Sequence, residues 1–125
     1  MYEYKASLKS ANDVHDGDTI RVLLSQGLRE YRDMAIRFYG INAPELWTAE
    51  GKVARDHLLS LIGGTYPAAL VIRTIKDAAD KYGERWDGKV WLESAGTWGP
   101  DNAFVVTTPS LNEQMILDSF AVKYP

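Results

Sequence analysis

The chain has 125 residues, of which 14 are Lys or Arg and 17 are Asp or Glu, and its net charge is -3. This length is typical of one domain with its own core, which we expect to span residues 1–125. The negative charge excludes a protein that coats nucleic acid by electrostatic attraction alone, so a nucleic-acid substrate would need a local basic cleft or a metal ion. The absence of cysteine excludes disulfides and thiolate metal sites.

Two strands are predicted in the first third of the chain. Asp16-Gly17-Asp18 is a turn signal, and residues 19–24 then alternate polar and apolar side chains before two leucines, as a half-buried strand does. Residues 30–41 alternate in the same way. They predict a second long strand that ends near Gly40.

A loop and a helix follow these strands. Pro44 has no amide hydrogen and disfavours helical geometry at Ala43, so residues 42–45 are expected to form a loop. Apolar residues then recur at helical spacing, and Gly63-Gly64 supplies a stop. The pattern predicts a helix over residues 49–62.

The next segment returns to strands. Residues 67–76 and 87–92 each have an apolar centre and predict two strands, joined by a polar loop over 77–84. Residues 94–108 are rich in glycine and polar side chains. They predict a loop with one short strand at 104–106.

A closing helix is predicted after Ser110, because Ser110 and Glu113 have the spacing of a capping box. Its expected apolar positions are Leu111, Met115, Phe120 and Val122. Strands, a helix, more strands and a last helix are typical of a mainly β (α+β) protein. We expect an OB-fold, a five-stranded antiparallel barrel formed mostly by residues 4–93 and capped by helices.

Four polar segments are candidates for chemistry, and each has a structural alternative. Residues 16–19 alone are a hairpin turn, and Arg37 alone is a surface cation paired with Asp33. Residues 42–45 alone are a loop. Residues 81–85 alone are a solvated run of charges.

In their order along the chain, these segments resemble the staphylococcal nuclease family. Its members carry an Asp-Gly-Asp-Thr turn, an arginine shortly before a loop ending in Pro-Glu, a Lys-Tyr-Gly-Arg loop, and a closing helix beginning with Leu-Asn or Val-Asn. The matching residues here are Asp16-Gly17-Asp18-Thr19, Arg37, Ala43-Pro44-Glu45, Lys81-Tyr82-Gly83 and Leu111-Asn112. The resemblance covers residues 14–124.

The resemblance implies a calcium-dependent endonuclease that hydrolyses DNA and RNA with little sequence specificity. Calcium would be held by Asp18, by the side-chain oxygen of Asn42 and by the backbone carbonyl of Ala43, all hard oxygen ligands. Family members commonly have aspartate where this chain has Asn42. The site therefore has one negative charge fewer, and we expect it to bind calcium weakly.

The resemblance also implies the catalytic groups. Glu45 would accept a proton from the attacking water or orient it, and Arg37 and Arg85 would bind the phosphate oxygens. Glu84 stands where the family has arginine, and Arg85 follows one residue late. We expect Arg85 to reach the phosphate if the loop absorbs the extra residue. Hydrolysis of a phosphodiester requires the same groups whether or not the resemblance holds. The phosphodiester repels hydroxide, so an enzyme must supply positive charge and a base.

Lys81, Tyr82 and Tyr124 are candidate substrate-binding residues that would hold a terminal phosphate or stack on a base. Their structural alternative is a loop anchor or the edge of the core. His15 and His57 are interpreted as bystanders. The four tryptophans are expected in the core or at the barrel rim.

Two other functions remain open. A weakened OB-fold module would bind nucleic acid or protein without catalysis, and a structural barrel would belong to a larger assembly. The joint presence of Asp18, Arg37 and Glu45 favours the enzyme, because a binding module needs no water-activating carboxylate beside a metal ligand. No run of residues is typical of a signal peptide or a membrane helix. By default we expect a cytoplasmic monomer that acts on nucleic acid.

Overall fold

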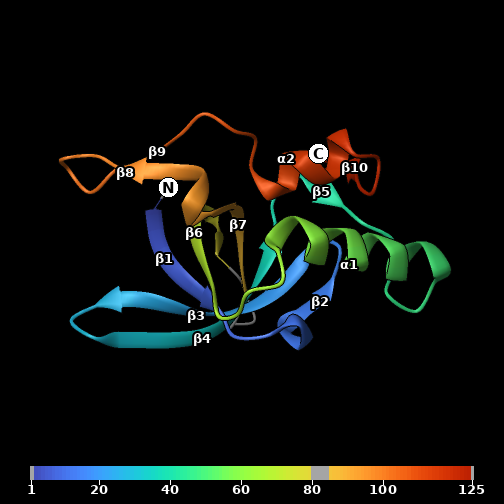
Figure 1. Cartoon of the computed structure of the whole chain (residues 1–125), viewed down its shortest axis with the longest axis horizontal. Coiled ribbons are helices and arrows are strands. Elements are labelled where there is room, and N and C mark those ends of the chain that lie inside the picture. The colour runs from blue at the N-terminus through green and yellow to red at the C-terminus, as the bar shows by residue number, and fades with distance from the viewer. Residues whose placement is uncertain (1, 80–84, 125) are drawn as a thin grey trace.

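A computed structural model describes residues 2–79 and 85–124, and this part is mainly β structure with two α-helices (Figure 1). The mainly β class predicted from the sequence is confirmed. The helices and strands, in chain order, are β1 (Tyr2–Leu8), β2 (Val14–Asp16), β3 (Thr19–Gly27), β4 (Glu30–Phe38), β5 (Ile41–Asn42), α1 (Ala49–Ile62), β6 (Ala68–Ala79), β7 (Arg85–Leu92), β8 (Gly96–Trp98), β9 (Phe104–Val106), α2 (Leu111–Leu117) and β10 (Val122–Lys123). Short 3-10 helices lie at Ala11–Asp13 and Glu93–Ala95.

The long strands form one sheet that closes on itself. The strand order is β1-β6-β7-β4-β3-β2, and β1 also pairs with β3, with Ala6 opposite Leu24. The strands β1, β6, β7, β4 and β3 therefore form a closed ring. The β3–β4 hairpin extends beyond this ring, at the lower left of Figure 1.

The expectation of a wholly antiparallel ring is wrong at one pair. β4 and β7 run parallel, with Ala35 opposite Arg85 and Arg37 opposite Asp87. The connection from β4 to β7 contains α1 and β6. A connection of this length allows β7 to run beside β4 in the same direction. This pairing brings Arg85 beside the strand that carries Arg37.

The two strands predicted first are confirmed, and their alternation builds the core. Ile20 and Val22 of β3 and Met34 and Ile36 of β4 are buried, while the residues between them are more exposed. Phe38, also fully buried, ends β4. Burying each of these side chains stabilises the fold by about 1.5–3 kcal/mol.

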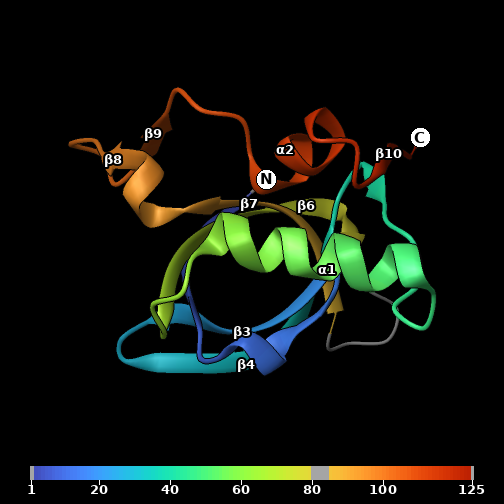
Figure 2. The same ribbon diagram turned by 45° about the vertical axis from the view of Figure 1, so that its right-hand side comes forward.

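The helix predicted over residues 49–62 is confirmed as α1. Thr48 caps it by accepting a hydrogen bond from the Gly51 amide at 2.9 Å. Ala54, Leu58 and Ile62 form its buried face and join the main core. Figure 2 shows α1 lying across the sheet.

The closing helix α2 is confirmed with its capping box but is shorter than predicted. Ser110 accepts a hydrogen bond from the Glu113 amide, and Met115 is fully buried. The helix ends at Leu117 because Ser119 adopts a positive φ of 67°. Val122 therefore lies in β10, which pairs with β5, and not in the helix.

The segment before α2 contains two short strands, not the one predicted. β9 is the expected strand at 104–106, and β8 pairs with it as an antiparallel hairpin. The hairpin packs through Phe104 and Trp98 against a second small core that contains Val71 and Trp91. The expectation for the tryptophans is wrong at Trp47, which is 80% exposed.

The predicted loop over 77–84 begins later, because β6 continues to Ala79. The predicted substrate contacts Lys81 and Tyr82 lie outside the described residues. Within the described part of the chain, no helix is long and apolar enough to cross a membrane.

Candidate active site

The turn between β2 and β3 carries Asp18 and is packed tightly against its neighbours. The Asp18 amide donates to Asp16 Oδ1 at 3.0 Å, and the Asp18 carbonyl accepts from the Phe38 amide at 2.7 Å. A Cβ on Gly17 would lie only 2.8 Å from the Ala43 Cβ and 3.0 Å from the Ala54 Cβ. Glycine is therefore needed here for close approach, which presses the turn against the loop and α1.

The Asp18 carboxylate joins this turn to the loop after β5. It is buried, and Oδ2 accepts a hydrogen bond from the Ala43 amide at 2.9 Å. The Thr19 hydroxyl donates to Oδ1 at 3.0 Å. Two segments that are far apart in the sequence are thus held together by one charged group.

Arg37, on β4, points its guanidinium at the same place. Nη1 donates to the carbonyls of Phe38 and Ile41 at 3.0 and 3.1 Å. Nη2 donates to Asn42 Oδ1 at 3.3 Å and lies 3.6 Å from Asp18 Oδ2. Both side-chain oxygens predicted to bind calcium therefore face one positive nitrogen.

Glu45 is held by the turn that begins α1. The Glu45 carbonyl accepts from the Thr48 hydroxyl at 2.7 Å and from the Thr48 amide at 3.0 Å. A Cβ on Gly51 would overlap this carbonyl, so Gly51 lets the helix approach the turn. The backbone of Glu45 is consequently fixed, while its side chain is exposed.

A polar cavity of about 340 Å³ gathers these residues. Its lining is His15, Asp16, Asp18, Thr19, Arg37, Asn42, Ala43, Glu45 and Arg85. The three residues predicted to bind metal and the three predicted to be catalytic are all in this set. They come from the β2–β3 turn, β4, β5 with its loop, and the start of β7.

A second cavity, of about 310 Å³, adjoins the first and shares Arg37 and Arg85 with it. Tyr39 and Tyr124 line it. The Tyr124 amide donates to the Gly40 carbonyl at 2.8 Å, and the Arg37 guanidinium lies 5.8 Å from the Tyr124 ring centre. The predicted substrate contact Tyr124 is therefore beside the polar cavity and 57% exposed.

His15 and Asp16 line the polar cavity, although the sequence analysis gave neither a role of its own. His15 Nε2 lies 3.9 Å from Asp16 Oδ2, and the His15 side chain is largely exposed. Burial, and then the neighbouring Asp18 carboxylate, raise the pKa of Asp16 to about 6. Asp16 is the first residue of the Asp-Gly-Asp-Thr motif and His15 precedes it, and this position was the signal available.

The donor chemistry of the cavity fits a hard cation. Asp16, Asp18 and Asn42 offer oxygen atoms, and Arg37 Nη2 already occupies a position where positive charge is stabilised by two of them. Over residues 2–79 and 85–124, no group of three or more His, Cys, Asp or Glu side chains has the arrangement of a metal site. The oxygen atoms are of the hard type that calcium prefers, and the binding of calcium here stays a prediction.

No protein-family model matches the sequence, and no curated protein matches it either. The assignment of a function to the cavity therefore depends on its residues and their geometry.

Proposed function

We propose that the chain is a calcium-dependent nuclease of the staphylococcal nuclease type, with the closed sheet as an OB-fold barrel. A single observation carries the proposal. One cavity is lined by Asp18, Asn42 and Ala43, the candidate metal ligands, and by Arg37, Glu45 and Arg85, the candidate catalytic groups. Packing alone does not require a carboxylate, an amide and two arginines from four segments to meet in one polar hollow.

In this proposal, Asp18, Asn42 and the Ala43 carbonyl would hold calcium, which would supply positive charge at the phosphodiester. Glu45 accepts a proton from the attacking water, and its fixed backbone keeps the carboxylate at the cavity edge. Arg85 binds a non-bridging phosphate oxygen. Its guanidinium offers two parallel charge-assisted hydrogen bonds as negative charge develops on the phosphate.

Arg37 needs only a small change to join Arg85. Nη1 keeps its hydrogen bonds to the Phe38 and Ile41 carbonyls, which fix the guanidinium in place. When the Asn42 side chain turns away, Nη2 can donate to a phosphate oxygen in its place. The side chain is then anchored at one nitrogen and free to bind substrate with the other.

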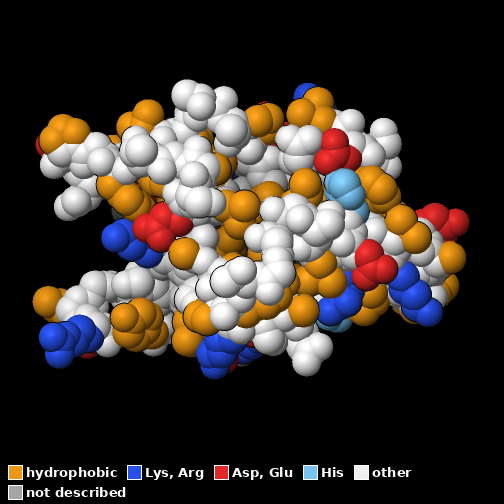
Figure 3. Space-filling model, in the orientation of Figure 1, with side chains coloured by type: hydrophobic (Ala, Val, Ile, Leu, Met, Phe, Trp, Pro, Cys, Tyr) orange, Lys and Arg blue, Asp and Glu red, His pale blue; other side chains and the backbone are white. Residues whose placement is uncertain are grey.

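Local charge matters because the molecule as a whole is negative. On the face that Figure 3 shows, lysine and arginine side chains lie in small separate groups. The positive charge that attracts nucleic acid would come from Arg37, Arg85 and bound calcium, because the same two cavities also contain carboxylates.

The test is incubation of the pure protein with single-stranded DNA and with RNA, in calcium and in chelator. We expect fragments only in calcium. Glu45→Gln should slow cleavage by about 10²–10⁴-fold, whereas Glu30→Gln, at the far end of β4, should not. Cleavage by Glu45→Gln at the wild-type rate would reject the assigned site.

A nucleic-acid-binding module is the second candidate, and the hydrogen bonding of Arg37 favours it. Asp18, Arg37 and Asn42 satisfy one another without a metal, as a static binding surface would require. This candidate predicts equal retention of single-stranded DNA in calcium and in chelator, with no fragments in either.

A further inference from the structure

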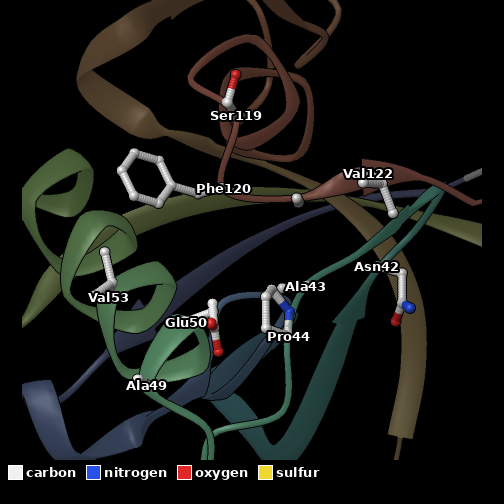
Figure 4. A pocket seen from close by; sticks show the side chains of 10 residues that line it. Asn42, Ala43, Pro44, Ala49, Glu50, Val53, Ser119, Phe120 and Val122 are labelled. Atoms are coloured by element: carbon white, nitrogen blue, oxygen red, sulfur yellow. The ribbon is translucent and has the colours of Figure 1, made fainter.

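An apolar cavity of about 670 Å³ lies next to the polar one (Figure 4). Ala49 and Val53 of α1 lie on one side of it together with Phe120, Val122 lies on the other side, and Pro44 lies between them. Its size is that of a small-molecule site. Asn42 and Ala43 line both cavities, so the apolar cavity directly adjoins the polar one.

The wall made by Phe120 is preformed. The His57 ring stacks on the Phe120 ring, with centroids 4.0 Å apart and planes inclined by 19°. His57 Nε2 is also 2.7 Å from Asp118 Oδ2, which ties α1 to the turn after α2. On the far side, pairing of β10 with β5 places Val122 opposite Asn42.

The charge of the lining disfavours an anionic occupant. Glu50 is the charged residue among those that line this cavity, and it would repel a second phosphate group. A nucleobase is neutral, with apolar faces and a polar edge. The apolar walls suit its faces, and the lining also contains the polar residues Asn42, Glu50 and Ser119.

We propose that this apolar cavity binds the base of a nucleotide adjoining the phosphodiester in the polar cavity. The inference rests on the proposed function and deepens it. One phosphodiester would then have a base on each side, one here and one at Tyr39 and Tyr124. A base in a walled cavity is unstacked from its neighbours, so the occupied strand is single.

The experiment fills the cavity with a tryptophan side chain and compares the result with the same substitution outside the cavity. Val53→Trp and Val122→Trp narrow it from opposite walls, and the control Val105→Trp lies on β9. Val53 and Val105 are 54% and 56% exposed, so the same change is made at similar exposure. Two measurements are made on each variant. Adenosine, which has no phosphate, is titrated and its binding is followed by nuclear magnetic resonance, and the KM for single-stranded DNA is determined in calcium.

We expect both cavity variants to lose the adenosine-induced shifts at residues 49–53 and 119–122, and to raise KM about tenfold, as loss of one base contact would. The control should match the wild type. Adenosine shifts in the cavity variants equal to those of the control would overturn the proposal. The proposal would also be overturned if sedimentation showed that the wild type is a dimer and that Val53→Trp dissociates it. A second copy of the chain would then cover the cavity. Cavity-dependent adenosine binding without any cleavage would retain the base site and reject the nuclease.

Discussion

Arg85 is the first residue of β7 and lines the polar cavity, although it stands one residue later than the family motif places its arginine. We predict that Arg85→Ala lowers turnover by about 10²–10³-fold, the size expected for losing a preorganised charge donor. Glu84→Ala should leave turnover unchanged or raise it, since it removes a negative charge next to Arg85 in the sequence. Steady-state rates on single-stranded DNA measure both variants, and the reverse ranking would contradict the assignment.

At the scale of single residues, the motif located Asp18, Arg37, Asn42 and Glu45, and the cavity contains all four. Side-chain identity and spacing were enough to predict that these residues lie together, while the roles proposed for them stay predictions. The raised pKa of Asp16 was not predictable, because it arises from burial produced by distant segments.

Gly17 gives a second example at the same scale. As part of a turn signal, it predicted a hairpin, and the hairpin is present. The structure shows that the position also requires glycine for contact with Ala43 and Ala54, which are remote in the sequence. Local pattern cannot reveal a contact that depends on tertiary packing.

At the scale of elements, Asn112 is the buried link between α2 and the sheet. Its Oδ1 accepts from the Val90 amide at 3.0 Å, and its Nδ2 donates to the Tyr39 and Gly88 carbonyls at 2.9 and 3.0 Å. Asn112→Ala leaves these three backbone groups without that partner. We predict a loss of at least about 1–3 kcal/mol of unfolding free energy, since buried unsatisfied groups are costly.

Urea denaturation measures this effect. The control is Leu117→Ala on the same helix, where the side chain is 65% exposed and the change should be small. Equal midpoints for Asn112→Ala and Leu117→Ala would show that water or another group replaces the amide.

The contact between α1 and the end of α2 predicts a pH dependence. Hydrogen bonds from His57 and then Gln114 lower the pKa of Asp118 below its ordinary value of 3.8. A group with a lowered folded pKa stabilises the protein above its unfolded pKa and loses that effect as the pH falls through the folded value. The stabilisation by Asp118 is therefore complete above about pH 4.

We predict that Asp118→Asn lowers the Tm at pH 7 and that its difference from the wild type shrinks as the pH falls below about 4. Thermal unfolding followed by circular dichroism from pH 7 to pH 3 measures the difference. A gap that widens toward pH 3 would show that the carboxylate is not the stabilising form.

The elements were predicted best where one segment carries its own signal. The helix over 49–62 has its cap, its apolar spacing and its glycine stop within one stretch, and α1 has those bounds. β8 was missed because Gly96-Thr97-Trp98 has no strand pattern of its own and is ordered by pairing with β9. The end of α2 was missed because apolar residues continue past Ser119, where the backbone leaves the helix.

At the scale of the whole molecule, closure of the ring depends on pairings between distant segments. β1 pairs with β6, so that Glu3 lies opposite Arg73, and the two side chains form an ion pair at 2.6 Å. The order of strands and helices in the sequence predicted a closed sheet, while the parallel pairing of β4 and β7 followed from the path of the chain. Direction of pairing is a property of the connection, and no strand pattern contains it.

The last prediction concerns calcium and the stability of the whole protein, through the substitution Asn42→Asp. The variant adds a negative charge at a candidate ligand and should bind calcium more tightly, because charged ligands raise calcium affinity. Since a ligand that binds only the folded state stabilises it by about 2.7 kcal/mol at a hundredfold excess over Kd, the variant should show a larger rise in Tm at equal calcium. Without calcium, repulsion from Asp18 is offset by Arg37 Nη2, which lies beside both side chains, so the Tm should change little. Thermal unfolding with and without calcium measures both effects, and Asn102→Asp on the β8–β9 hairpin controls for the added charge. A calcium-induced rise in Asn42→Asp no larger than in Asn102→Asp would show that residue 42 does not bind the cation.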